Sequence, residues 1–190
     1  MRDAALAPYF MYYDSGGFLK SWLLDTSLAD HVSNLGRNCA GGVSGRAMSD
    51  TSRAPNPNFS GHWVFSREAS TLSPNGADRI RSGHMHIEHR EPNFRCQFRY
   101  DFDDGNHFEG SFQLATDGHE SEVLEKGRPS LTSLRWDGDV LVFAGREQGT
   151  IVLRHELLDA GKRLRISEQN RGMGHDQDNT FVFDREASSP

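Results

Sequence analysis

The chain has 190 residues, of which 35% are hydrophobic, enough for one ordinary core and too few for a typical two-domain enzyme. Its formal net charge is −6 and its 21 Lys and Arg residues are scattered, which excludes a nucleic-acid partner. The two cysteines can form at most one bridge, and we interpret them as reduced thiols. Near the start no long uncharged apolar run occurs, so we expect neither a secretory signal nor a membrane span, and a cytoplasmic protein.

Residues 1–55 differ in pattern from the rest of the chain. Apolar residues recur at helical spacing between residues 18 and 23 and between 28 and 35, which predicts two short helices. A glycine-rich stretch and the turn-rich run 52–58 then indicate a linker. We therefore divide the chain into a helical leader with linker, 1–55, and a second domain, 56–190. The leader is either dispensable for the fold or a helical lid on the second domain.

From Phe59 onward, short runs of alternating polar and apolar residues replace the helical period. The predicted strands are 59–67, 79–90, 93–102, 107–115, 119–126, 130–136, 139–145, 150–158, 162–170 and 178–185. Residue pairs suited to tight turns lie between them at Asp104-Gly105, Asp117-Gly118, Asp137-Gly138 and Ala160-Gly161. Short connections predict a meander, and closure is how such a sheet avoids open edges. The sequence thus predicts an all-β fold, a closed antiparallel up-and-down barrel of 8–10 strands after a short helical segment.

Several motifs resemble those of a known family. Gly61-His62-Trp63 resembles the Gly-x-Trp signature of lipocalins, in which the Trp closes the barrel floor. Together with Asn56-Pro-Asn-Phe-Ser-Gly-His-Trp, the segments Ile87-Glu-His-Arg-Glu-Pro-Asn, Thr116-Asp-Gly, Trp136-Asp-Gly-Asp and Leu157-Leu-Asp-Ala-Gly-Lys look like a group of uncharacterised bacterial lipocalin-like proteins of the calycin superfamily. The resemblance covers nearly all of 56–185 and implies a calycin-type barrel with a ligand-sized cavity, but no particular reaction. That group usually carries Thr or a similar residue where His62 stands, so the histidines here depart from its pattern.

Nine histidines are a high number for this length. Strand alternation places His62, His84 and His86 on one face of the first two strands. Two imidazoles from one strand and a third from its neighbour can form a zinc site with an open position for water, whose pKa would fall to about 7. His155 is an alternative third ligand if it points inward from across the barrel.

The opposite face of the same strands is apolar. If the turn through Pro92 pairs His89 with Phe94, the apolar faces of the second and third strands form one core wall. On that wall Phe94, Phe98 and Tyr100 would shape a substrate pocket. The histidine face would then lie outside the barrel, where only the leader or a second subunit, as in a homodimer, would shield it. Glu168 alternates with apolar residues and would need a partner such as an Arg to stay charged when buried.

Two functions follow from these patterns. The first is a zinc-dependent hydrolase of small ester or phosphoester substrates, in which the histidine-bound metal activates water. The second is a non-catalytic binder of a small hydrophobic ligand, with the histidines on the surface. We rank the hydrolase first because ligand burial does not explain the number of histidines. In both hypotheses the partner is a small molecule, and neither nucleic acid nor a membrane is expected.

Overall fold

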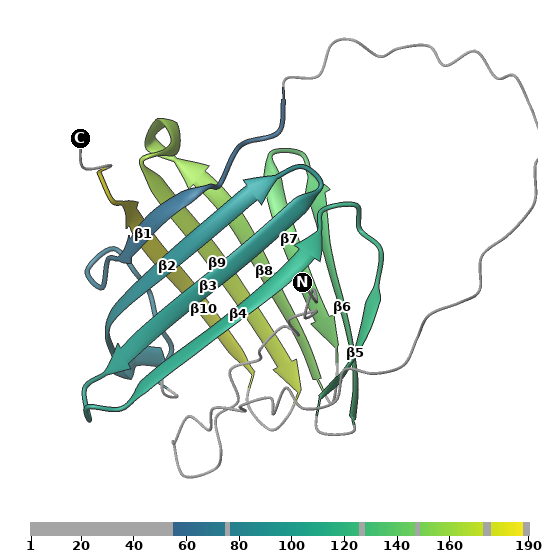
Figure 1. Cartoon of the computed structure of the whole chain (residues 1–190). Coiled ribbons are helices and arrows are strands. Elements are labelled where there is room, and N and C mark those ends of the chain that lie inside the picture. Colours follow the sequence, from purple (N-terminus) through teal and green to yellow (C-terminus); the bar gives the residue numbers. More distant parts are fainter. Residues whose placement is uncertain (1–54, 75–76, 126–127, 147–148, 173–175, 188–190) are drawn as a thin grey trace, which may run out of the picture.

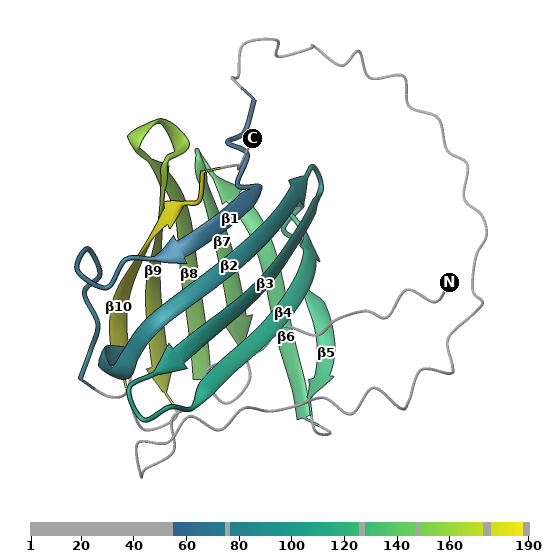
Figure 2. The same cartoon turned by 60° about the vertical axis from the view of Figure 1, so that its left-hand side comes forward.

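The computed structural model describes residues 55–74, 77–125, 128–146, 149–172 and 176–187. Ten antiparallel strands form one sheet that curls around a common interior (Figures 1 and 2). The strands are β1 (Gly61–Phe65), β2 (Ile80–Arg90), β3 (Asn93–Phe102), β4 (His107–Ala115), β5 (Ser121–Glu125), β6 (Arg128–Asp137), β7 (Val140–Arg146), β8 (Gly149–Leu158), β9 (Arg163–Gly172) and β10 (Gln177–Arg185). Two 3-10 turns, η1 (Ala77–Arg79) and η2 (Asp159–Gly161), complete the elements. The helices expected in residues 1–55 lie outside the described residues and stay predictions, and none of the described helices is long and apolar enough to cross a membrane.

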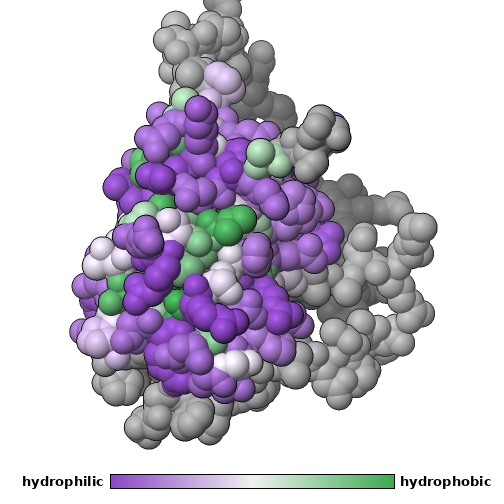
Figure 3. Space-filling view, turned by 90° about the vertical axis from the view of Figure 1, so that its left-hand side faces the viewer, coloured by the Kyte–Doolittle hydropathy of each residue, from purple (hydrophilic) through white to green (hydrophobic). Residues whose placement is uncertain are grey.

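Strand alternation separates an inner, apolar face from an outer, polar one. The predicted pairing through Pro92 is confirmed, because His89 lies opposite Phe94 and Met85 opposite Phe98. Burial alternates along β2 and β3 in the same register, with the apolar side chains inside. The opposite side of the sheet is largely hydrophilic, and Figure 3 shows such a surface, with a few hydrophobic residues gathered near its centre.

The sheet does not close through hydrogen bonds, and the prediction of a closed barrel is wrong in this respect. The strand order β4-β3-β2-β1-β10-β9-β8-β7-β6-β5 leaves β4 and β5 as edges in the described part of the chain. Gly118, with a φ of 81°, donates its N–H to the carbonyl of Leu134 on β6 at 2.9 Å, and Asp117 bridges to Arg135. The Asp117-Gly118 turn therefore leads the chain from β4 onto β6 instead of back along β4. The result is a curled half-barrel.

Aromatic side chains fill much of the interior. Trp63, Phe94 and Phe183 are fully buried, and each such side chain contributes about 2–3 kcal/mol by leaving water. The guanidinium carbon of Arg185 lies 4.1 Å from the centre of the Trp63 ring. This cation–π contact covers the tryptophan of the Gly-x-Trp motif. Gly83 lies under the ring of Tyr100, where a methyl group would come within 2.7 Å of the Tyr100 Cδ1 atom. The core thus consists of close contacts between rings and the backbone of neighbouring strands.

Candidate functional site

The three histidines of the predicted zinc site lie on the outer face of β1 and β2. His62 is directly opposite His86, whereas His84 is opposite Val64. The rings of His62 and His86 stack with centroids 4.2 Å apart and planes inclined by 2°. His62 and His84 are exposed and His86 is half-buried, along a surface hollow of about 230 Å³. The structure therefore brings two of the three rings together by stacking.

This geometry overturns the metal-dependent hydrolase. The lone pairs of imidazole lie in the ring plane, so an ion bound by two rings must lie in both planes, and two stacked parallel rings share none. Across the described ranges, no group of three His, Cys, Asp or Glu side chains could hold a metal ion. Strand alternation predicted the shared face correctly, but the rings on that face do not converge. The residues assigned to activating water thus do not assemble into a reaction centre.

His155, the alternative ligand, lies on the inner face, away from the other three histidines. Its side chain is 2% exposed, and its Nδ1–H donates to the carbonyl of Leu141 at 3.2 Å. Burial lowers the pKa of His155 to about 4, although the hydrogen bonds to backbone carbonyls oppose that fall. Its ring lies edge-on to those of Phe59 and Phe94. His155 is therefore a neutral part of the core.

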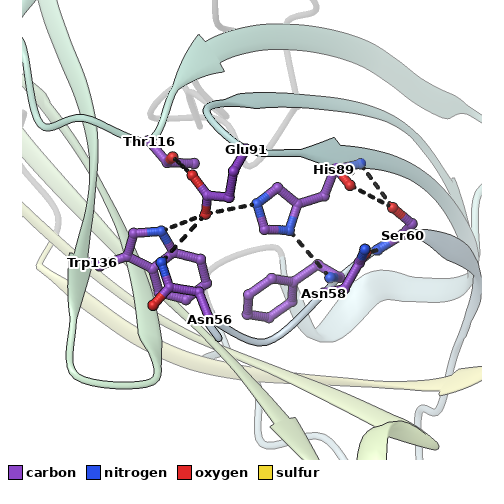
Figure 4. Close-up of polar contacts among 8 residues, drawn as sticks. Asn56, Asn58, Ser60, His89, Glu91, Thr116 and Trp136 are labelled. Carbon is purple, nitrogen blue, oxygen red and sulfur yellow. Dashed lines mark hydrogen bonds and ion pairs between the residues drawn. The ribbon is translucent and has the colours of Figure 1, made fainter. Parts of the chain in front are cut away.

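A hydrogen-bond network ties β2, β6 and the end of β4 together at one end of the half-barrel (Figure 4). The Glu91 carboxylate accepts from Trp136 Nε1 at 2.7 Å, from His89 Nε2 at 3.2 Å and from the Thr116 hydroxyl. His89 Nδ1 accepts from the Phe59 N–H at 3.3 Å, so the proton of the neutral ring lies on Nε2. Burial alone would raise the pKa of Glu91, but the hydrogen bonds, first that from Thr116, bring it below its usual value.

Phe59 fills the same end of the half-barrel. We call it the aromatic end, because the rings of Phe59, His89, Phe94 and Trp136 lie together there. Its ring is fully buried and lies 5.9 Å from those of His89 and Trp136 and 6.3 Å from that of Phe94, between ring centroids. Phe94, predicted to line a pocket, therefore lies in a closed part of the interior. The sequence predicted Phe59 as the first residue of the strand 59–67, whereas the structure begins β1 at Gly61 and leaves Phe59 before it, where its ring is buried.

The other two predicted pocket residues lie further along the inner face of β3. Tyr100 is buried and packs against Phe65 and Phe181 at 6.3 and 6.2 Å. Phe98 points the same way but stays partly exposed. A role for these residues in contacting a ligand stays a prediction.

Three polar side chains on the inner face form what we call the polar set: Glu168 on β9, and Gln177 and Asn179 on β10. Glu168 lies directly opposite Asn179, in the register that pairs the buried Ile166 with Phe181. Glu168 is 6% exposed, and Gln177 and Asn179 are each 3% exposed. This polar set therefore lies on the wall of the same interior as the apolar core.

Two atoms of the polar set lack hydrogen-bond partners in the part of the chain that the structure describes. Asn179 Oδ1 accepts from the N–H and the hydroxyl of Ser73, both at 2.7 Å. Asn179 Nδ2, a donor, and Gln177 Oε1, an acceptor, have no hydrogen-bond partner among the residues described. Buried polar atoms normally find partners, so each unpaired atom calls for an explanation.

Within the described ranges, no Arg or other cation pairs with Glu168 as the sequence led us to expect. Burial raises its pKa to about 7. The neighbouring Asn179 side chain opposes part of this rise in the pKa of Glu168, and the negative charge of Asp178 adds to it. Gln177 and Asn179 alternate with Phe181 and Phe183, so the same parity argument that singled out Glu168 would have found them.

Solvent reaches part of the inner face beside Glu168. Leu153 on β8 lies between Phe143 and Glu168 in the register, and both of these neighbours are buried and point inward. Leu153 shares their face and is nevertheless only partly buried, as is Phe98. The interior therefore holds an aromatic, closed end and, at Leu153 beside Glu168, a part that solvent reaches.

The comparisons with known proteins support the fold alone. Neither a protein-family model nor a curated protein matches the sequence. A secretory abundant heat soluble protein from Ramazzottius varieornatus superposes with a TM-score of 0.50 at 11% identity, over 67% of this chain and 95% of that one. Echinococcus granulosus fatty-acid-binding protein 1 gives 0.47 at 10% identity over 68% and 98%, and a fatty acid transporter, REP1-NXSQ, gives 0.49 at 13% over 69% and 98%. The chain thus shares its antiparallel β-barrel architecture with solved structures, whereas its resemblance to the bacterial group stays a prediction.

Proposed function

We propose that the protein is a non-catalytic binder of a small hydrophobic ligand, held inside the half-barrel against the polar set. The observation that carries this proposal is Leu153, an apolar side chain left partly exposed on the inner face beside Glu168. On the next strand, β10, lie the two buried atoms of the polar set that have no partner among the described residues. Binding sites for small hydrophobic molecules combine a mostly apolar lining with a few polar groups that fix orientation. A homodimer stays a prediction.

The buried titratable groups near this space suit binding better than catalysis. The ring of His155 is engaged with a carbonyl and neutral at physiological pH. His89 is buried and held in the network at the aromatic end, behind Phe59, and its hydrogen-bond partner Glu91 is exposed at the surface. A general base must lie within hydrogen-bonding reach of its substrate. In the described interior, only Glu168 adjoins the part near Leu153 that solvent reaches.

The test is saturable binding of Nile red, a neutral fluorescent apolar probe, to the full chain. Leu153→Trp places a bulky ring in the space and is expected to weaken probe binding at least about tenfold. Val152→Trp is the matched control, because Val152 lies on the outer face of the same strand, opposite Ala144 and the exposed Gln169. Circular dichroism and thermal unfolding establish that both variants fold.

Two outcomes would contradict the proposal: no saturable binding to the wild-type chain, or equal weakening by both tryptophans in folded protein. A second control removes the outer histidines. The double change His84→Ala and His86→Ala is expected to leave stability and probe affinity unchanged, because both side chains lie on the opposite face from Leu153.

A further inference from the structure

The inner face carries few charges. Among the inward positions of strands whose side chains are described, two are charged, Glu168 and Arg185. All other inward positions in that part of the sheet are apolar, glycine, neutral polar or histidine. Which of these two charges the polar end of a bound ligand would meet therefore depends on where each one lies.

Arg185 is unavailable to a ligand at the polar set. Its Nε donates to the Gly161 carbonyl at 2.6 Å, its Nη1 donates to the Ser60 carbonyl, and its guanidinium covers Trp63. Arg185 lies six positions after Asn179 along β10, which corresponds to about 20 Å in an extended strand.

Another cation near the polar set, Arg171, lies on the outer face. Its Nη2 binds the Asp178 carboxylate at 2.7 Å, and its Nη1 binds the Gln177 carbonyl at 2.9 Å. The strand alternation that points Gln177 inward points Asp178 and Arg171 outward. A carboxylate placed against the polar set would therefore face Glu168 without a described cation to balance it.

We propose, building on the function proposed above, that the polar set selects apolar ligands whose polar end donates hydrogen bonds, a hydroxyl or an amine, and rejects carboxylates. Glu168 and Gln177 Oε1 accept hydrogen bonds from such a group, and Asn179 Nδ2 donates to the oxygen of a hydroxyl. Because its pKa is near 7, Glu168 ionises readily next to an ammonium group. A ligand carboxylate would instead repel the ionised form of Glu168, and this repulsion would weaken binding of the carboxylate.

The experiment compares decylamine, 1-decanol and decanoate, which share one chain length, as competitors of Nile red at about pH 8. The amine and the alcohol are expected to displace the probe at concentrations at least about tenfold below that of decanoate. Glu168→Gln, which keeps the shape of the side chain, is expected to reduce the preference for amine over decanoate by at least about tenfold. Asp178→Asn removes one negative charge on the outer face beside the same site and is expected to leave that preference within about twofold.

The outcomes separate the two proposals. If Nile red binds and decanoate competes as well as the amine, the selectivity is refuted while the binding function stands. If Nile red binds to the folded wild-type chain and none of the three competes, selectivity by the polar set is also refuted. If neither Nile red nor any competitor binds, the proposed function itself fails. A preference for the amine that survives Glu168→Gln would refute the assignment to the polar set.

Discussion

Replacing Glu168 by glutamine is expected to make the protein increasingly more stable than the wild type as the pH rises. The pKa of Glu168 is raised by burial from 4.5 to about 7, so the native state prefers the protonated carboxyl group. The stability contributed by this preference is complete below pH 4.5 and is lost as the pH rises through 7. At about 1.4 kcal/mol for each pKa unit, the loss amounts to about 3 kcal/mol by about pH 8. Glutamine does not ionise, so the variant does not lose this stability as the pH rises.

The measurement is urea unfolding followed by tryptophan fluorescence between about pH 4 and pH 8. The difference in unfolding free energy between Glu168→Gln and wild type is expected to rise by about 3 kcal/mol across this range. His155 acts in the opposite direction, because its pKa is lowered from 6.5 to about 4 and its contribution is lost as the pH falls through that window. Since both proteins contain His155, its effect cancels in the difference. A difference that stays flat within about 0.5 kcal/mol would refute the burial argument for Glu168.

Two further substitutions test contacts that shape the interior. Gly83→Ala is expected to lower the unfolding free energy by about 1–3 kcal/mol, because the new methyl group would collide with the Tyr100 ring; unchanged stability in the urea titration would contradict that contact. Trp136→Phe removes a donor to Glu91 and is expected to cost about 1 kcal/mol near neutral pH. Because the pKa of Glu91 is lowered, this cost should shrink as the pH falls through the lowered value, and a cost independent of pH would argue against the hydrogen bond.

Local sequence signals predicted the strands well. The expected ranges 93–102 and 107–115 coincide with β3 and β4, and Gly105 between them has a φ of 83°. Alternation and positive-φ turn residues act over a few neighbours, so they can be read directly from the sequence. The failure of the sheet to close could not be predicted in this way. It depends on the contact of Gly118 with Leu134, which lies sixteen residues further along the chain.

The site was also harder to predict, because it depends on ring orientation and on contacts between residues far apart in the sequence. Parity correctly placed His62 and His86 on one face, but it contains no information on ring orientation, and the rings stack. Glu168 was recognised as a candidate buried carboxylate, yet its neighbour across the strands is Asn179 in place of the arginine expected. That neighbour follows from the register of β9 and β10, which depends on the length and shape of their connection.

The seam between β4 and β5 has a mechanical consequence. No ladder joins these two strands in the described part of the chain, so moving them apart breaks no strand pairing along the seam and loosens only contacts such as that of Gly118 with β6. Elsewhere consecutive ladders join every pair of neighbouring strands, so we expect the sheet to yield first between β4 and β5. For the ligand binding proposed above, we expect a bulky molecule to be accommodated by separation of β4 from β5.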